Sequence, residues 1–250
     1  MLTLALYAVA ALTQGQDFSW SGAIPQGKTL TVKNIIGSIT VEAASGREAS
    51  VTAVKRRGDD GDPEDVEIRR VEEGDAIIFC VIYPNHDDDG DCDMNTRNRR
   101  GRRHWDGDQN DTEVNFTVRV PAGVPLSVGS VTGDVTARGV RGDTDARSVS
   151  GDVRLEDIEG KVVEASSVSG NIELERIRAE EVGAETVSGD VDFSGEIRPR
   201  GEYDLKTLSG DIVMLIPRGV GAEITGSTFS GDFESSFPIT TTSSSRFSKR

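Results

Sequence analysis

The amino-acid sequence predicts an all-β protein, a right-handed parallel β-solenoid with rungs of about 20 residues. Three observations support this class. A six-residue phrase recurs along the second half of the chain, its spacing is nearly constant, and apolar and polar residues alternate within it. The copies are SVTGDV (130–135), SVSGDV (148–153), SVSGNI (167–172), TVSGDV (186–191), TLSGDI (207–212) and TFSGDF (228–233). A period near 20 held over six copies is typical of stacked repeat units.

Alternation within each copy predicts strands with one buried face. In the second copy the apolar parity contains Val149, Gly151, Val153 and Leu155, and the polar parity contains Ser150, Asp152 and Arg154. We expect the first set to point into a shared core and the second set outward. A weaker apolar set between the copies predicts a second strand per coil. Crossovers between parallel strands are almost always right-handed, which sets the expected hand of the coil.

One glycine recurs in every copy, on the parity expected to point inward. These residues are Gly133, Gly151, Gly170, Gly189, Gly210 and Gly231. Two explanations fit the pattern: a bend that needs a positive φ, or a narrow place where a Cβ atom would collide. We favour the bend.

Stacking also predicts two polar columns on the outer surface. The hydroxyl column contains Thr132, Ser150, Ser169, Ser188, Ser209 and Ser230. The acidic column contains Asp134, Asp152, Asn171, Asp190, Asp211 and Asp232. Neighbouring like charges in a sheet repel, so the acidic column needs a reason. Each Asp either accepts a hydrogen bond at a turn or helps to hold a ladder of cations such as Ca²⁺. We favour the turn role and predict no metal site and no cofactor.

Composition limits the partners and the location. The net charge is −15, which argues against a phosphate-binding surface and therefore against nucleic acid. Residues 1–15 carry no charge and contain a short apolar run that resembles a secretory signal peptide. A buried first element is the alternative. No later segment is apolar enough to cross a membrane, so we expect an exported protein of the periplasm or cell surface.

Residues 17–128 are expected to form an N-terminal β region, followed by solenoid repeats over 129–236 and a flexible, truncated tail over 237–250. Strands are expected near 18–20, 29–33, 38–42, 50–55, 66–71, 76–83 and 112–120. The sequence Ile36-Gly37-Ser38-Ile39 is similar to the repeat, so the solenoid can begin there. A long charged loop is predicted over 84–112. Residues 85–90 match the start of a calcium loop, but position twelve is Thr96 rather than Glu, so a solvated loop is preferred.

Cys80 and Cys92 are the only two cysteines. In an exported chain, two cysteines twelve residues apart form a candidate disulfide. A metal site built from these and the two histidines lacks any ligand spacing.

The sequence resembles the DUF4097 family of β-strand repeats. The resemblance rests on VPAGVPL at 120–126 followed by the repeated [ST]-[VLF]-[ST]-G-[DN]-[VIF], on Ile35–Val41, and on the strand that ends VIYP at 81–84. It covers roughly residues 28–236. The resemblance implies a β-solenoid, a bacterial envelope location, an adhesin label and no catalytic residues.

Three functions are consistent with these features. The first is a non-enzymatic envelope protein that presents flat β faces to a surface, a glycan or a protein partner. The second is an accessory or sensing module for envelope stress. The third is a carbohydrate-active β-helix enzyme, which would need an acid/base group in a cleft. Only the loop with His86, Asp87–Asp89 and His104 offers irregular candidates for that role. We predict no catalytic residues and the first function.

Overall fold

The computed structural model describes residues 17–84, 92, 110–220, 223, 225 and 234–236. The chain forms two compact units, Met1–Arg218 and Gly219–Arg250, and the fold described below is that of the first. The predicted signal peptide, the tail from 237 and most of the charged loop lie outside the described residues. The same holds for Gly231 and Asp232.

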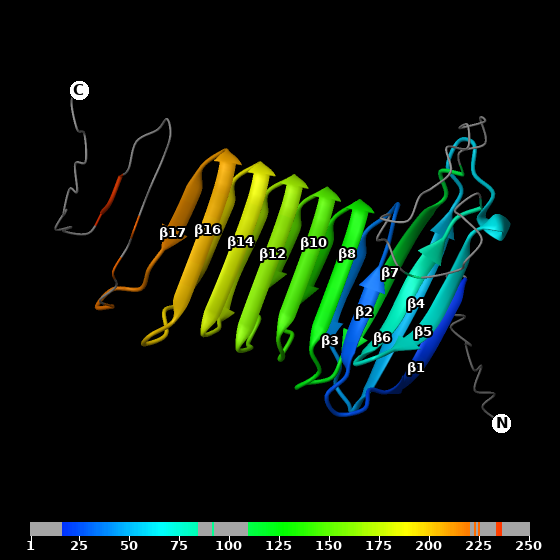
Figure 1. Cartoon of the computed structure of the whole chain (residues 1–250), viewed down its shortest axis with the longest axis horizontal. Helices are drawn as coiled ribbons and strands as arrows, with labels where there is room; N and C mark the ends of the chain where they lie inside the picture. Colours follow the sequence, from blue (N-terminus) through cyan, green and yellow to red (C-terminus); the bar gives the residue numbers. More distant parts are fainter. Residues whose placement is uncertain are drawn as a thin grey trace, which may run out of the picture. The chain divides into compact units, whose positions relative to one another are not determined.

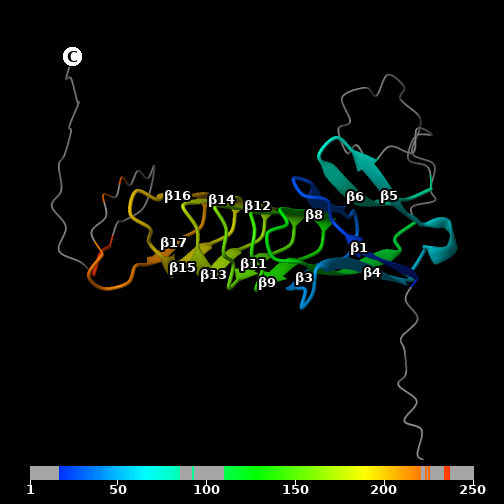
Figure 2. The same cartoon turned by 90° about the horizontal axis from the view of Figure 1, so that it is seen from below.

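The first unit consists of two sheets that enclose the core, as expected for a parallel β-solenoid (Figure 1). Figure 2 shows the two sheets as separate layers. The nine-stranded sheet has the order β1-β4-β7-β3-β9-β11-β13-β15-β17, and the eight-stranded sheet has the order β16-β14-β12-β10-β8-β2-β6-β5. We call them sheet A and sheet B. The strands are β1 (Phe18–Ala23), β2 (Thr29–Lys33), β3 (Ile39–Ala43), β4 (Glu48–Arg56), β5 (Glu67–Glu73), β6 (Ala76–Ile82), β7 (Glu113–Val120), β8 (Leu126–Thr132), β9 (Val135–Arg138), β10 (Thr144–Ser150), β11 (Val153–Glu156), β12 (Val162–Ser169), β13 (Ile172–Arg178), β14 (Glu181–Ser188), β15 (Val191–Glu196), β16 (Glu202–Ser209) and β17 (Ile212–Leu215).

Each repeat forms one coil, with one strand in sheet B and the next in sheet A. Neighbouring coils pair in parallel and in register, so equivalent side chains form continuous columns. In sheet A, Val153 pairs with Ile172, and Ile172 pairs with Val191. These three residues are fully buried, and β-branched side chains of this kind pack well on a pleated surface. The core is therefore a stack of thin aliphatic layers.

The repeat phrase is not one continuous strand, which corrects the expected direction of its first half. Val153 and Leu155 are buried as predicted, but Val149 is 44% exposed and Ser148 is buried in its place. The chain passes from sheet B to sheet A at Gly151, and Val149 and Ser150 are both exposed on the approach to that corner. Five positions separate the inward Ser148 from the inward Val153. Because five is odd, the inward parity changes at the corner.

The N-terminal region is part of the same stack. β2 and β3 form a coil that pairs directly with β8 and β9, so the similarity at Ile36–Ile39 reflects a genuine first coil. β6 and β7 pair in parallel with the other side of that coil. The boundary expected at 128/129 falls inside β8, within one compact unit.

Antiparallel strands close the N-terminal end of the stack. β5 pairs with β6 as the predicted hairpin, and β1 and β4 extend sheet A beyond β7. Phe18 and Trp20 pack on Phe79, with ring centroids 5.9 and 5.0 Å away. Arg70 lies 5.4 Å from the centre of the Trp20 ring, within the range of a cation–π contact. These side chains cover the core at this end.

Candidate functional surfaces

The recurring glycine lies where successive coils approach most closely. A Cβ added to Gly170 would lie 2.6 Å from the carbonyl carbon of Gly151 and closer still to its oxygen, well inside any real Cβ contact. The same collision with the preceding coil occurs at Gly133, Gly151, Gly189 and Gly210. Gly133 also has a φ of +144°, but Gly151 and Gly170 lie outside the left-handed region. Collision therefore explains all five described members of the column, and the favoured bend applies only to some of them.

Buried hydroxyl groups bind the glycine carbonyls of the preceding coil. Ser148 Oγ donates to the carbonyl oxygen of Gly133 at 3.0 Å, and Ser167 Oγ donates to that of Gly151 at 3.0 Å. Thr186 and Thr207 repeat the contact in the next two coils. Buried polar atoms need such partners, so the first residue of each of the five described phrases is a structural hydroxyl. Sequence reasoning missed this column, although Ser or Thr opens all six copies.

The acidic column stabilises the backbone of the coil that follows. Asp134 Oδ1 accepts a hydrogen bond from the backbone N–H of Asp152 at 3.0 Å, and Asp152 Oδ1 accepts one from Asn171 at 2.8 Å. The contact continues from Asn171 to Asp190 and from Asp190 to Asp211. The role resembles the expected turn hydrogen bond, but the donor belongs to the next coil. An amide oxygen accepts this bond as well as a carboxylate does, which explains why Asn171 fits the column.

The described residues contain no group of three or more His, Cys, Asp or Glu side chains placed to hold a metal ion. One carboxylate oxygen of each of Asp134, Asp152 and Asp190 is already bound to a backbone N–H. The calcium-loop alternative at 85–90 lies outside the described residues, as do His86, Asp87–Asp89 and His104.

An apolar column runs along the outer face of sheet B, next to the corner. It contains Val131, Val149, Val168, Val187 and Leu208, one from each of β8, β10, β12, β14 and β16. Val149, Val168 and Val187 are 44%, 45% and 43% exposed, and Leu208 is 82% exposed. We call this column the outer apolar stripe. Sequence reasoning placed Val149 and its equivalents in the core, because it did not detect the change of parity at the corner.

The outer face of sheet A carries charged side chains that pair between coils. Glu156 contacts Arg138 at 2.9 Å on one side and Arg176 on the other, and Arg154 pairs with Glu173. Where two acids are neighbours, the carboxyl of Glu173 raises the pKa of Glu175 above its ordinary value. Exposed ion pairs of this kind contribute little to stability, so the charged side chains of this face can leave one ionic partner for another at little cost.

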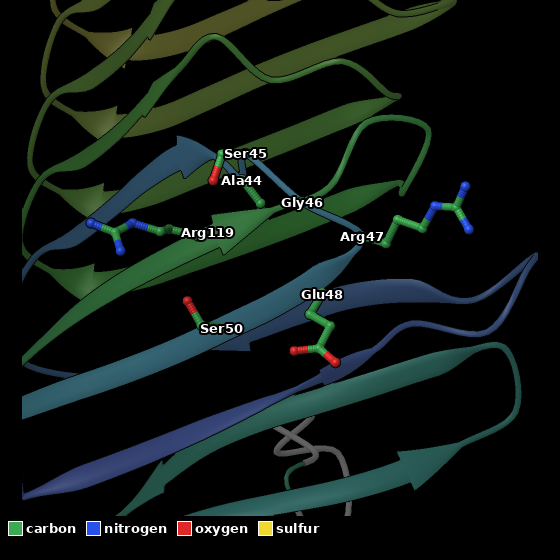
Figure 3. A pocket seen from close by; sticks show the side chains of 7 residues that line it. All are labelled: Ala44, Ser45, Gly46, Arg47, Glu48, Ser50 and Arg119. Carbon is green, nitrogen blue, oxygen red and sulfur yellow. The ribbon is translucent and has the colours of Figure 1, made fainter.

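One hollow lies at the turn between β3 and β4, beside β7 (Figure 3). It is lined by Ala44, Ser45, Gly46, Arg47, Glu48, Ser50 and Arg119. Figure 3 shows the side chains of Arg47 and Arg119 pointing away from one another. Arg119 lies 3.7 Å from Glu42, so its charge is already partly compensated. Ser45, Ser50 and Glu48 all line the hollow, but among the described residues no hydrogen bond joins either serine hydroxyl to the Glu48 carboxylate, as a serine nucleophile activated by a base would need.

Cys80 and Cys92 form a disulfide with a Cα–Cα distance of 5.7 Å. Both residues are buried against Ile78, with Val71 and Ile82 packed around them. Lys33 Nζ donates a hydrogen bond to the carbonyl oxygen of Cys92 at 2.9 Å. The disulfide therefore fixes one point of the segment between β6 and β7 on the outer face of sheet B.

At the end of that segment, Tyr83 donates a hydrogen bond from its hydroxyl to the carbonyl oxygen of Thr112 at 2.6 Å. Burial raises the pKa of Tyr83 well above its ordinary value, so the hydroxyl remains a donor. Asp111 accepts hydrogen bonds from the backbone N–H groups of Asp59 and Asp60 at 2.8 and 3.1 Å. The Tyr83 hydrogen bond thus joins the two ends of the segment, and the Asp111 hydrogen bonds tie its second end to the loop after β4.

The stacked coils, the glycine corner and the two columns of hydrogen bonds define a parallel β-solenoid. Its distinctive side chains repeat from coil to coil and do not gather at one site. The chain belongs to the Toastrack DUF4097 family, whose model matches residues 88–249.

The chain is similar to the following three solved structures. A putative cell adhesion protein from Clostridium sporogenes is 9% identical, with 80% of this chain and 99% of that chain covered and a TM-score of 0.43. A putative adhesin from Bacteroides fragilis is 12% identical, covering 79% and 96%, with a TM-score of 0.39. A putative lipid binding protein from Parabacteroides distasonis is 13% identical, covering 81% and 97%, with a TM-score of 0.25. No curated protein matches the chain. Within the described ranges, no helix is long and apolar enough to span a bilayer.

Proposed function

We propose that this chain is an exported, non-enzymatic binding module of the bacterial cell envelope that holds a surface polymer on the outer face of sheet A. The observation that carries the proposal is the repetition of charged, paired side chains along that face in the three successive coils of β9, β11 and β13. Arg138, Arg154 and Arg176 each pair with a carboxylate of a neighbouring coil. Repeated weak contacts suit a partner that also repeats, because their combined strength grows with the number engaged.

A polysaccharide is the partner that these groups fit best. Guanidinium and carboxylate groups bind sugar hydroxyls from both sides, as donors and acceptors. Exposed ion pairs give up little when a ligand replaces one partner, since each pair is worth less than about 1 kcal/mol. The absence of catalysis is part of the proposal: in the described residues the ionisable groups of this face recur, whereas an enzyme needs one acid or base in a unique setting.

The test is binding of the purified protein to immobilised envelope polysaccharide from the source bacterium. The variant Arg138→Gln/Arg154→Gln/Arg176→Gln should bind at least 10-fold more weakly. Arg147→Gln/Lys206→Gln, on the outer face of sheet B, is the matched control and should bind like the wild type. Equal binding by all three proteins, or no binding by the wild type, would refute the assignment of this face.

The location is tested separately by fractionating the source bacterium and probing with an antibody. We expect the protein in the periplasmic or surface fraction, in agreement with the signal-like residues 1–15. Recovery in the cytoplasm alone would refute the envelope proposal.

A further inference from the structure

The outer apolar stripe is unusually regular for an exposed feature. Register pairs Ser150 with Ser169 and Ser169 with Ser188, so the valines that precede these serines lie directly beside one another. The stripe continues unbroken across five coils. The core does not require the stripe, because other residues of the same strands, such as Ala146, Ala165 and Ala184, form the buried face.

The surroundings of the stripe leave it uncovered. In its own strand, Val168 has the short side chains of Ser166 and Ser169 as its partly or fully exposed neighbours. Three coils have a longer neighbour two residues before the stripe, namely Arg147, Glu185 or Lys206. Arg147 and Lys206 each form an ion pair with the Asp two residues before them in their own strand, on the side away from the stripe. The stripe is therefore a continuous apolar line with short or charged side chains beside it on the same face. Isolated exposed apolar residues are ordinary, whereas a contiguous line of them marks a contact surface.

We propose that the outer face of sheet B, centred on this stripe, binds the same face of a second copy of this chain. A second copy is the partner whose repeat matches that of this face. Residues in adjacent coils are about 4.8 Å apart, because that is the spacing of strands in a sheet. The turns of an α-helix repeat every 5.4 Å, and same-face residues of an extended peptide repeat at about 6.6 Å, so both lose register over five coils. A second solenoid has the same repeat and keeps it.

The size of the face is consistent with a weak, specific dimer. Five strands of about eight residues cover roughly 24 by 26 Å, or about 600 Å² in projection. A stable interface buries about 800 Å² per partner, and face-to-face sheets pack about 10 Å apart. The apolar part of the face is only one stripe wide, so we expect a dissociation constant in the micromolar to millimolar range. This inference does not depend on the proposed function of sheet A.

Sedimentation velocity of the whole chain over a range of concentrations tests the proposal. The wild type should shift from monomer toward dimer as concentration rises, and Val168→Lys should weaken this association at least 10-fold. Val213→Lys is the matched control, because Val213 is 47% exposed on the other sheet, and it should associate like the wild type. Circular dichroism should show that both variants fold.

A cysteine at the centre of the stripe provides a second, independent measurement. Val168 is the middle member of five, so it meets its own copy whether the two stripes run in the same or in opposite directions. Val168→Cys should therefore form a covalent dimer under mild oxidation, and Val213→Cys should not. A wild type that stays monomeric at millimolar concentration overturns the proposal. Equal effects of the two lysine variants, or equal cross-linking of the two cysteine variants, also overturn it.

Discussion

Replacing Gly170 by alanine isolates the close stacking of coils from the conformational freedom of glycine. Gly170 has a backbone that alanine adopts without strain, since its φ lies outside the left-handed region. The added Cβ would nevertheless lie 2.6 Å from the carbonyl carbon of Gly151. The two coils must separate locally, or the corner must distort.

The expected loss of stability follows from the contacts at that corner. Overpacking a rigid site costs about 1–3 kcal/mol. Separation also weakens the hydrogen bonds from Gly151 N–H to the carbonyl of Ser169 (3.2 Å) and from Ser167 Oγ to the carbonyl of Gly151 (3.0 Å), each worth about 1 kcal/mol. The free energy of unfolding should therefore fall by about 3–5 kcal/mol. For a unit of this size, each kcal/mol lowers Tm by about 2–4 °C, so Tm should fall by roughly 6–20 °C.

Thermal unfolding followed by circular dichroism measures this change, and Gly183→Ala is the matched control. The nearest atom to a Cβ at Gly183 is Glu164 Cγ at 3.8 Å, an ordinary contact. This variant should be neutral or slightly stabilising, because alanine restricts the unfolded chain. If Gly170→Ala melts within a degree or two of Gly183→Ala, the stacking explanation of the glycine column is wrong.

Four further changes test other contacts of the stack. Asp152→Asn should leave Tm nearly unchanged, because the side-chain oxygen still accepts the hydrogen bond from the next coil. Asp152→Ala should lower the free energy of unfolding, measured in urea, by about 1 kcal/mol. Equal losses of stability in the two variants would contradict the acceptor role. Ser167→Ala should cost about 1 kcal/mol by removing a buried donor, and an unchanged Tm would show that the bond contributes nothing. Thiol titration of the denatured, unreduced protein should detect no free Cys80 or Cys92, and reduction should cost at most about 3 kcal/mol; two free thiols would exclude the disulfide. Glu175→Gln should raise Tm slightly at neutral pH, because it removes the repulsion between the carboxylates of Glu173 and Glu175. The advantage should disappear as the pH falls through the raised pKa of Glu175, because protonation of the wild-type carboxyl removes the same repulsion. A difference in Tm that stays constant across pH would contradict this prediction.

The solenoid could be predicted because the same short sequence pattern recurs several times. One SVSGDV phrase is compatible with many folds, but six at nearly constant spacing leave few alternatives to stacked coils. The hairpin of β5 and β6 was also predictable, since two alternating runs flank a short turn. The cysteine pair required only its count and an oxidising compartment.

The direction of Val149 and the role of Ser148 could not be predicted from alternation alone. Period-two patterns identify the faces of a strand, but they do not show where a chain leaves one sheet for another. The passage from β10 to β11 changes the parity, so the apolar residue before the corner lies outside and the hydroxyl before it lies inside. Two serines two positions apart in the same phrase thus have different roles. The placement of β6 and β7 was also hidden, because pairing between distant segments leaves no periodic signal.

The position of the first coil within the stack has a consequence for how the chain folds as it is made. β2 lies between β6 and β8, and β3 lies between β7 and β9, although both precede these neighbours in the sequence. Leu30 pairs with Leu126, so this contact must close a loop of nearly a hundred residues, which is slow compared with closing one coil. The later coils need only their nearest neighbours in sequence. They can assemble soon after synthesis, whereas the first coil keeps one edge unpaired until Thr132 at the end of β8 has emerged.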